Sequence, residues 1–224
     1  MAIRLEKGQK INLEKDNGSR LTNFCVGCNW GAIVTYQPKL LGLLKKKETH
    51  DIDLDLSCIM LDANGDICDH IYSPLYRKEF LDHYGMPPGK VDSNDRAMHH
   101  SGDDLKGDQE GDDGLDNEII TVDLTKVSSN IDQIFFFLNN CGKEDFSQIP
   151  YASIRMYEGT PTRVNNIFAE YNVSAMPQYK GMTALIMGKL YRRNNNWKFG
   201  AIGDAFPDNN ICVTIGRIIK DYAR

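Results

Sequence analysis

Residues 101–124 read Ser-Gly-Asp-Asp-Leu-Lys-Gly-Asp-Gln-Glu-Gly-Asp-Asp-Gly-Leu-Asp-Asn-Glu-Ile-Ile-Thr-Val-Asp-Leu, an acidic, glycine-punctuated loop that runs directly into an alternating β-strand. The stretch contains nine carboxylates and one lysine, which is a charge of −8 in a chain of net charge −5. Like charges crowded in this way repel one another, and a bound cation would relieve the repulsion. Because a strand follows directly, the acidic segment is predicted to be an anchored loop rather than a free tail.

The residue types of this loop favour a hard cation. Glycines at positions 102, 107, 111 and 114 allow positive φ, so the backbone can curl and direct several oxygens at one point. Ca²⁺ takes six to eight oxygen ligands at about 2.3–2.6 Å, which suits such a loop. A disordered acidic loop without metal has a similar composition, and composition alone leaves both interpretations open.

Length and composition indicate one ordinary globular domain spanning residues 1–224, with 41% hydrophobic and 25% charged residues. The net acidity argues against a nucleic-acid partner, which requires a basic face. No apolar run approaches the roughly 20 residues of a membrane span, so we expect no membrane insertion. The first residues lack the hydrophobic segment of a signal peptide, so a cytoplasmic location is expected.

Six cysteines are scattered through a chain large enough to fold without disulfides. Cys25-Val-Gly-Cys28 has the spacing of a zinc knuckle or a redox pair. No second such pair lies at a finger-like distance, and Asn29-Trp30-Gly31 does not begin a helix as a thioredoxin-like site would require. Reduced, part-buried thiols are therefore the favoured interpretation.

Short β-rich runs bounded by Gly, Asn, Asp or Pro predict an all-β fold, a two-sheet β-sandwich. The predicted strands are 3–5, 10–13, 23–30, 53–61, 67–72, 119–123, 133–139, 152–158, 167–171, 183–192, 196–205 and 211–215. Hairpin turns are predicted at residues 62–66, which contain Asn64-Gly65, and at residues 194–196. Residues 127–131 are expected to form a helical turn, and residues 216–224 a short helix. Residues 37–50 and 77–96 resemble insertions at the surface.

A second acidic stretch lies upstream of the loop. His50-Asp-Ile-Asp-Leu-Asp-Leu-Ser-Cys58 alternates strictly, which places Asp51, Asp53 and Asp55 on one face of a strand. These carboxylates either form a solvated outer face of the sandwich or meet the 101–118 loop and complete a metal cage. Alternation by itself favours the solvated face.

Several separated motifs occur together and in order. They are Gly27-Cys-Asn-Trp30, Asp51-Ile-Asp-Leu-Asp-Leu-Ser57, Ser101-Gly-Asp-Asp-Leu-Lys-Gly-Asp108, Asp116-Asn-Glu118, the strand at 119–124, and Leu190-Tyr-Arg-Arg193 followed by Asn196-Trp-Lys-Phe199. In this combination the chain, from Leu5 to about Phe206, resembles the TerD family of tellurium-resistance and general stress proteins. Three features depart from the family pattern: Leu56 replaces the usual alanine, Asp104 replaces the usual asparagine, and the stretch from Gly107 to Glu118 is longer than in compact members.

The resemblance implies a β-sandwich with calcium-binding loops at one end, commonly holding two Ca²⁺ ions, and a binding or scaffold role in a bacterial stress response. The ligand candidates carried over are Asp53, Asp55, Asp103, Asp104, Asp108, Asp116 and Glu118, followed by Asp112 and Asp113. Backbone carbonyls near Leu105, Gly107 and Gly111 would complete the coordination. The implied partners are other stress-response proteins, and association with a membrane-bound complex is one form that this could take.

Catalysis is not predicted. Two-metal hydrolases also cluster carboxylates but commonly add histidine ligands, for which His99 and His100 are the candidates, and a structural role is favoured for them. The chain has no Gly-x-Ser-x-Gly elbow, phosphate-binding P-loop or dinucleotide fingerprint. Two alternatives stay open. One is a divalent-metal phosphoesterase or nuclease, and the other is a calcium-dependent adhesion or carbohydrate-binding sandwich.

Overall fold

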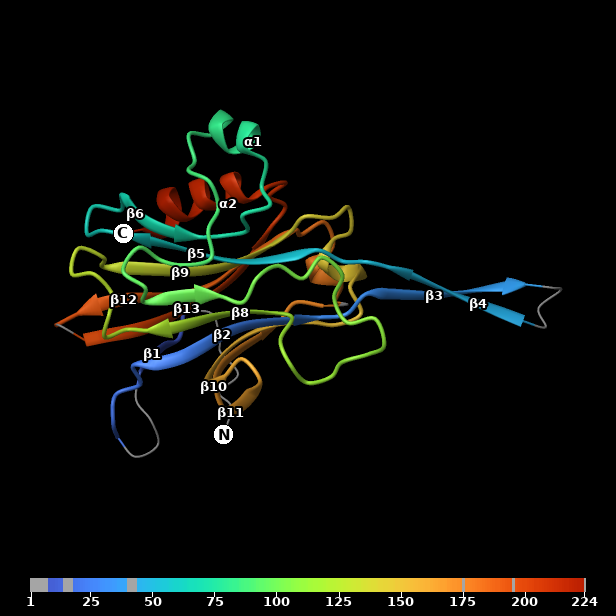
Figure 1. The fold of residues 1–224 in the computed structure, drawn as a ribbon, viewed down its shortest axis with the longest axis horizontal. Helices are drawn as coiled ribbons and strands as arrows, with labels where there is room; N and C mark the ends of the chain where they lie inside the picture. Colours follow the sequence, from blue (N-terminus) through green and yellow to red (C-terminus); the bar gives the residue numbers. More distant parts are fainter. Residues whose placement is uncertain (1–7, 14–17, 40–43, 175, 195, 224) are drawn as a thin grey trace.

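The structure is a computed structural model that describes residues 8–13, 18–39, 44–174, 176–194 and 196–223. Two antiparallel β-sheets pack face to face, and a separate two-stranded hairpin projects from one end of the sandwich (Figure 1). The all-β, two-sheet prediction is therefore confirmed. The predicted strand at residues 3–5 lies outside the described residues.

The larger sheet has six strands, in the order β1 (Lys10–Asn12), β13 (Asn196–Phe206), β12 (Ala184–Arg193), β9 (Gln133–Asn140), β5 (Leu54–Leu61) and β6 (Ile67–Ile71). The smaller sheet has five, in the order β11 (Arg163–Asn172), β10 (Ala152–Thr160), β2 (Asn23–Trp30), β8 (Glu118–Asp123) and β7 (Met98–His100). The projecting pair is β3 (Ile33–Lys39) and β4 (Leu44–His50).

The described helical segments are short. They are α1 (Lys78–His83), α2 (Ile211–Arg217), the π-helical turn η3 (Ile218–Tyr222), and the 3₁₀ turns η1 (Phe146–Gln148) and η2 (Pro177–Tyr179). None of them combines the length and the apolar composition needed to cross a membrane. In Figure 1, α2 lies along the outer face of the six-stranded sheet, and α1 lies farther out on the same side.

The six-stranded sheet is covered on both faces. Leu54, Leu56 and Met60 of β5 belong to the core between the sheets, whereas Ile59 and Leu61 pack in a second apolar cluster with α2. Every residue of β5 and β9 is consequently buried. Because side chains alternate along a strand, Asp55 lies on the covered outer face and not on an open, solvated one.

The C-terminal prediction was wrong in one element. Residues 211–215 were expected as a strand but form helix α2, which begins at Asn210, whose side chain accepts a hydrogen bond from the Val213 N–H at 3.1 Å. Ile211, Ile215 and Ile218 recur at helical spacing, so all three face the sheet. The short terminal helix predicted at 216–224 is the end of α2 followed by η3.

Other differences are local. Residues 127–131 form turns without a helix, and strand β7 was not predicted. Residues 37–50 contain part of β3 and all of β4, while residues 77–96 contain α1. The hairpin predicted at 62–66 is present, where Asp62 Oδ1 accepts from the Asn64 and Asp66 N–H groups at 2.8 and 2.9 Å. All six cysteines are free, as predicted.

Candidate metal centre

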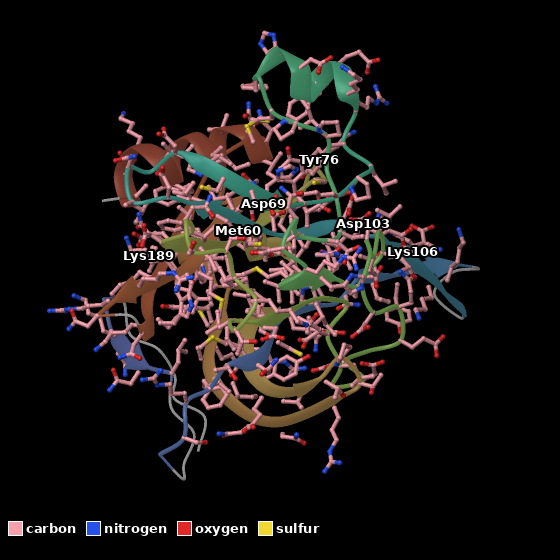
Figure 2. All side chains as sticks on the ribbon, turned by 60° about the vertical axis from the view of Figure 1, so that its left-hand side comes forward. Met60, Asp69, Tyr76, Asp103, Lys106 and Lys189 are labelled. Carbon is pink, nitrogen blue, oxygen red and sulfur yellow. The ribbon has the colours of Figure 1, made fainter. Side chains whose placement is uncertain are left out.

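The acidic loop has a defined course at the end of the sandwich from which β3 and β4 depart. Backbone bonds anchor it to neighbouring segments: the Ile52 N–H donates to Lys106 O at 3.1 Å, and the Asp108 N–H donates to Trp30 O at 3.0 Å. The Asn117 N–H donates to Cys28 O at 2.9 Å, which aligns the end of the loop with β2. In Figure 2, Asp103 and Lys106 lie near the root of this hairpin, with Tyr76 on the side towards α1.

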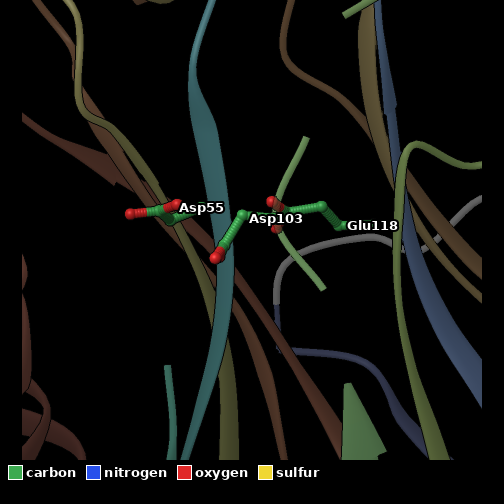
Figure 3. Close-up of side chains that lie close together, drawn as sticks. All are labelled: Asp55, Asp103 and Glu118. Carbon is green, nitrogen blue, oxygen red and sulfur yellow. The ribbon is translucent and has the colours of Figure 1, made fainter. Parts of the chain in front are cut away.

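Three carboxylates from three segments converge at the start of the loop. Asp55 of β5, Asp103 of the loop and Glu118 of β8 each offer an oxygen, and these oxygens lie within 4.8 Å of one another. Figure 3 shows Asp103 between the other two side chains. We name this group the inner cluster. The upstream strand and the loop, some fifty residues apart in sequence, therefore meet at one point.

Glu118 holds this group together. Its side chain is fully buried, and its two oxygens accept hydrogen bonds from the Leu56 N–H at 2.8 Å and the Asp104 N–H at 3.0 Å. His100 is also buried, and its Nε2 lies 3.4 Å from Glu118 Oε2. His100 Nδ1 accepts from the Gly102 N–H at 3.0 Å, so the histidine orders the start of the loop.

The side chains of Asp53 and Asp55 both have raised pKa values. Burial, and then the neighbouring carboxylates, raises the pKa of Asp53 to about 6. Burial raises the pKa of Asp55 to about 6, although a bond from Cys141 Sγ at 2.8 Å opposes the rise. Both residues line a cavity of about 500 Å³ beside Tyr76, which gives the carboxylates a route to solvent.

A second group lies farther along the loop. Asp108, Asp112 and Asp113 offer oxygens within 4.8 Å of one another, and we name them the outer cluster. Asp108 Oδ2 accepts from the Tyr151 hydroxyl at 2.8 Å, and Asp112 Oδ1 accepts from Asn29 Nδ2 at 2.9 Å. The Asn29 bond, the largest cause, lowers the pKa of Asp112.

Asp104 and Asn117 connect the two clusters. Asn117 Nδ2 lies 3.1 Å from Asp104 Oδ2 and 3.2 Å from Asp108 Oδ1, and its Oδ1 accepts from the Trp30 N–H at 2.8 Å. Asp104 Oδ1 accepts from the Lys106 and Gly107 N–H groups at 2.9 and 3.1 Å. Asp104 therefore shapes the turn of the loop while lying between the two groups of carboxylates.

Asp116 lies apart from both clusters. Its fully buried side chain places Oδ1 2.9 Å from Arg155 Nε, and Arg155 Nη2 also donates to Gly114 O at 3.0 Å. Asp116 Oδ2 is buried without a hydrogen-bond partner among the described residues. Burial raises the pKa of Asp116, and Arg155 counteracts part of that rise.

The predicted ligand set fits a hard cation. All of its members supply carboxylate oxygens, and two oxygens on opposite sides of one Ca²⁺ lie about 4.6–5.2 Å apart, which matches the spacing within each cluster. Asp53 Oδ1 is buried with no partner among the described groups, and a buried unpaired carboxylate oxygen needs a donor or a cation. The residues present are therefore compatible with bound Ca²⁺.

Several residues that order the site were not among the residues predicted from the sequence. They are Asn29, Trp30, Asn117, Tyr151, Arg155, Tyr76 and Cys141. Asn29, Trp30 and Asn117 belong to motifs already recognised, so their position in those motifs was an available signal. Arg155 lies in β10, and Tyr151 directly precedes that strand. Both reach the loop only because β10 pairs with β2.

This β-sandwich with a carboxylate-rich loop at one end is the architecture expected from the resemblance, and comparison with known proteins agrees. The TerD domain model matches residues 1–214, so the chain belongs to the TerD family. Two solved structures share the fold. One is protein SAV2460, of unknown function, with 16% sequence identity and a TM-score of 0.58, which covers 88% of this chain and 96% of that chain. The other is SCO6318 from Streptomyces coelicolor A3(2), described as a homologue of telluride resistance protein TerD, with 13% sequence identity and a TM-score of 0.57, which covers 91% of this chain and 98% of that chain.

Several named proteins align with this chain over most of their own length. Stress response protein SCP2 of Bacillus subtilis is 34% identical over 98% of this chain and all of its own length. General stress protein 16U of the same organism is 31% identical over 99% of this chain and 97% of its own length. Tellurium resistance protein TerZ of Serratia marcescens is 29% identical over 91% of this chain and 90% of its own length.

Proposed function

We propose that this protein binds Ca²⁺ and acts as a binding or scaffold module in a stress response. The observation that supports this most is the convergence of Asp55 and Glu118, from one strand of each sheet, with Asp103 of the acidic loop. Three carboxylates brought together at a partly buried point repel one another, so the fold tolerates them at a cost that a divalent cation would offset. The stress-response setting is taken from the names of the relatives.

In this proposal the inner cluster, with Asp53 and Asp104 beside it, holds one Ca²⁺, and the outer cluster holds a second. Asp116 stays a predicted ligand, although it is ion-paired with Arg155 here. Bound Ca²⁺ supplies positive charge that neutralises the loop. The chain's own residues do the rest: Glu118 ties both sheets to the loop, and Asn117 keeps the two clusters in register. The ordered loop then presents a surface to a partner.

The partner is proposed to be another stress-response protein in the cytoplasm, and the role is binding rather than catalysis. In support, the polar side chains beside the clusters contact the loop backbone or the carboxylates. His100 Nδ1 accepts from the Gly102 N–H while Nε2 faces Glu118, and the Tyr151 hydroxyl donates to Asp108. These groups orient carboxylates, which is the arrangement of a cation-binding site with a stiff surface.

Substitutions that remove one charge from each cluster test the proposal. Asp103→Asn should abolish the Ca²⁺-dependent rise in melting temperature that comes from the inner cluster, and Asp113→Asn the part that comes from the outer cluster. Asp66→Asn, at an exposed position in the β5–β6 turn, is the matched control and should respond to Ca²⁺ as the native chain does. If all three variants keep the native response, the clusters do not bind the ion.

A further inference from the structure

The cavity beside Tyr76 lies over β5 and β9, on the face of the six-stranded sheet that carries α1 and α2 (Figure 1). Its volume is about 500 Å³, and every residue that lines it is described. Small-molecule sites have volumes of about 300–1,000 Å³, and a single metal ion fills only a small part of such a space. The cavity therefore has room for an organic ligand that the proposed calcium site does not use.

One buried amide oxygen that lines this cavity has no hydrogen-bond partner among the described residues. It is Oδ1 of Asn139 in β9, a residue that is 1% exposed. Its amide orientation is fixed, because Nδ2 donates to Thr214 Oγ1 at 2.9 Å, and that hydroxyl donates to the ion-paired Asp208 at 3.3 Å. The oxygens of the other amides that line the cavity all accept a hydrogen bond; they belong to Asn140, Asn209 and Asn210. A buried acceptor without a partner points to a donor that the protein itself does not supply.

Two carboxylates lie beside this oxygen. Asp55 is the register partner of Asn139 on the neighbouring strand, so both side chains lie on the same face of the sheet, with Cβ atoms about 4.5–5.5 Å apart. Asp53 also lines the cavity, and its Oδ1 is buried without a partner among the described groups. An amide oxygen beside two carboxylates is best satisfied by a positively charged group that donates several hydrogen bonds.

The side of the cavity that opens to solvent is largely apolar. Leu75 and Leu105, which are 62% and 49% exposed, line it together with Phe80 of α1 and Ile211 of α2. Arg77 is the only cation among the described residues of the lining, and its exposed guanidinium is screened by water and salt. The cavity therefore suits a ligand with a cationic donor at one end and an apolar chain at the other.

We propose that this cavity binds a small organic amine, whose primary ammonium group donates to Asn139 Oδ1, Asp53 and Asp55 while its apolar chain lies along Leu75 and Leu105. A primary ammonium has three N–H donors, one for each acceptor. A lysine side chain of another protein has the same chemistry, but the volume of the cavity fits a complete small molecule, so a free amine is the occupant that we propose. Because Asp55 also belongs to the inner cluster, Ca²⁺ and the amine should compete, but the inference does not require the calcium site.

NMR titration of the full-length, ¹⁵N-labelled chain with hexylamine in EDTA tests this inference separately from calcium binding. The signals of the Asn139 side-chain amide should shift and reach saturation at roughly millimolar hexylamine, as expected for so small a ligand. Hexan-1-ol lacks the charge and tetramethylammonium lacks N–H donors, so both should bind at least about tenfold more weakly. Nα-acetyl-lysine N-methylamide, which carries the same ammonium on a peptide unit, should also bind more weakly than hexylamine.

Variants at both ends of the cavity test the two halves of the ligand. Asn139→Leu should weaken hexylamine binding about tenfold, since it removes a hydrogen bond to a charged group. That change also removes the bond to Thr214, so the exposed pair Leu75→Ser with Leu105→Ser gives an independent test and should weaken binding roughly tenfold. Ile67→Ser with Ile219→Ser is the matched control, because both positions are exposed and lie outside the cavity.

Four results would overturn the inference. They are the absence of any saturable shift with hexylamine, as expected if water alone satisfies Asn139, equal binding of hexan-1-ol, an equal loss of binding in the control pair, and tighter binding of the lysine derivative than of hexylamine. Failure of the calcium proposal would leave the titration in EDTA unchanged, so the two proposals can fail separately.

Discussion

Glu118 and Leu56 link the two sheets of the sandwich: Oε2 of the buried Glu118, at the start of β8, accepts the Leu56 backbone N–H of β5 at 2.8 Å. The other oxygen of the same carboxylate accepts the Asp104 N–H of the acidic loop. One side chain therefore fixes the distance between the sheets and the position of the loop. Its role in stability should be separable from the binding of a cation.

Replacing Glu118 should destabilise the protein even without metal. In Glu118→Gln one amide oxygen can satisfy only one of the two N–H groups, so urea unfolding in EDTA should show a loss of about 2–3 kcal/mol. Asp103→Asn, in the same cluster, removes no such bond and should unfold within about 0.5 kcal/mol of the native chain in EDTA. Equal stability of the Glu118 variant would mean that the carboxylate does not join the sheets.

Asp55→Asn should have the opposite effect on the metal-free protein. The pKa of Asp55 is raised to about 6 in the folded state against 3.8 for the ordinary group, so the folded protein holds the proton more tightly. The stability from that proton is complete below pH 3.8 and is lost as the pH rises through 6. In EDTA the asparagine variant should therefore be more stable at pH 7.5, by up to about 3 kcal/mol, and the gain should vanish near pH 4. A gain that is independent of pH would contradict this assignment.

Gly107 should tolerate no side chain. It has φ of +68°, and a Cβ there would lie 2.5 Å from the Trp30 indole, whose Nε1 donates to Ile52 O at 2.8 Å. Gly111→Ala is the matched control, because it also has positive φ but nothing within 4 Å. Both substitutions cost about 1–2 kcal/mol for the left-handed backbone. Gly107→Ala should melt several degrees lower than Gly111→Ala and change the Trp30 fluorescence, and equal melting temperatures would contradict the contact.

Arg155 should be needed mainly to neutralise Asp116. Arg155→Gln leaves the buried Asp116 carboxylate without its ion-pair partner, so unfolding should become easier by about 3–5 kcal/mol. Adding Asp116→Asn to that variant removes the unpaired charge and should recover a large part of the loss. A double-mutant cycle in urea measures this coupling. No recovery in the double variant would show that Arg155 acts through Gly114 O instead.

The sequence patterns predicted the sandwich because alternation and turn residues are local properties. The turn at residues 62–66 and the pairing of β12 with β13 follow from such signals. Helix α2 was misassigned because a short run such as Ile211–Ile215, with four apolar residues and one threonine, can suit either a strand or a helix. Only the cap at Asn210 and the sheet face beneath it favour the helix. The burial of Phe135 and Phe137 on the outer face depends on that same helix.

The candidate site was predictable in its carboxylates but not in their grouping. The alternation at residues 51–55 and the loop composition identify the acids. The positions of these carboxylates depend on partners from elsewhere in the fold, such as Tyr151 for Asp108 of the outer cluster and Arg155 for Asp116, which lies apart from both clusters. Those contacts follow from the pairing of β10 with β2, which no local pattern specifies.

Binding of Ca²⁺ by the two carboxylate clusters can be measured by calorimetric titration of the EDTA-stripped, dialysed protein with Ca²⁺, and separately with Mg²⁺. We expect two Ca²⁺ ions to bind per chain below about millimolar concentration, and the smaller Mg²⁺ to bind more weakly. Asp103→Asn should remove one of the two binding events. No heat from Ca²⁺ below millimolar concentration, or equal affinity for the two ions, would mean that the clusters are not a calcium site.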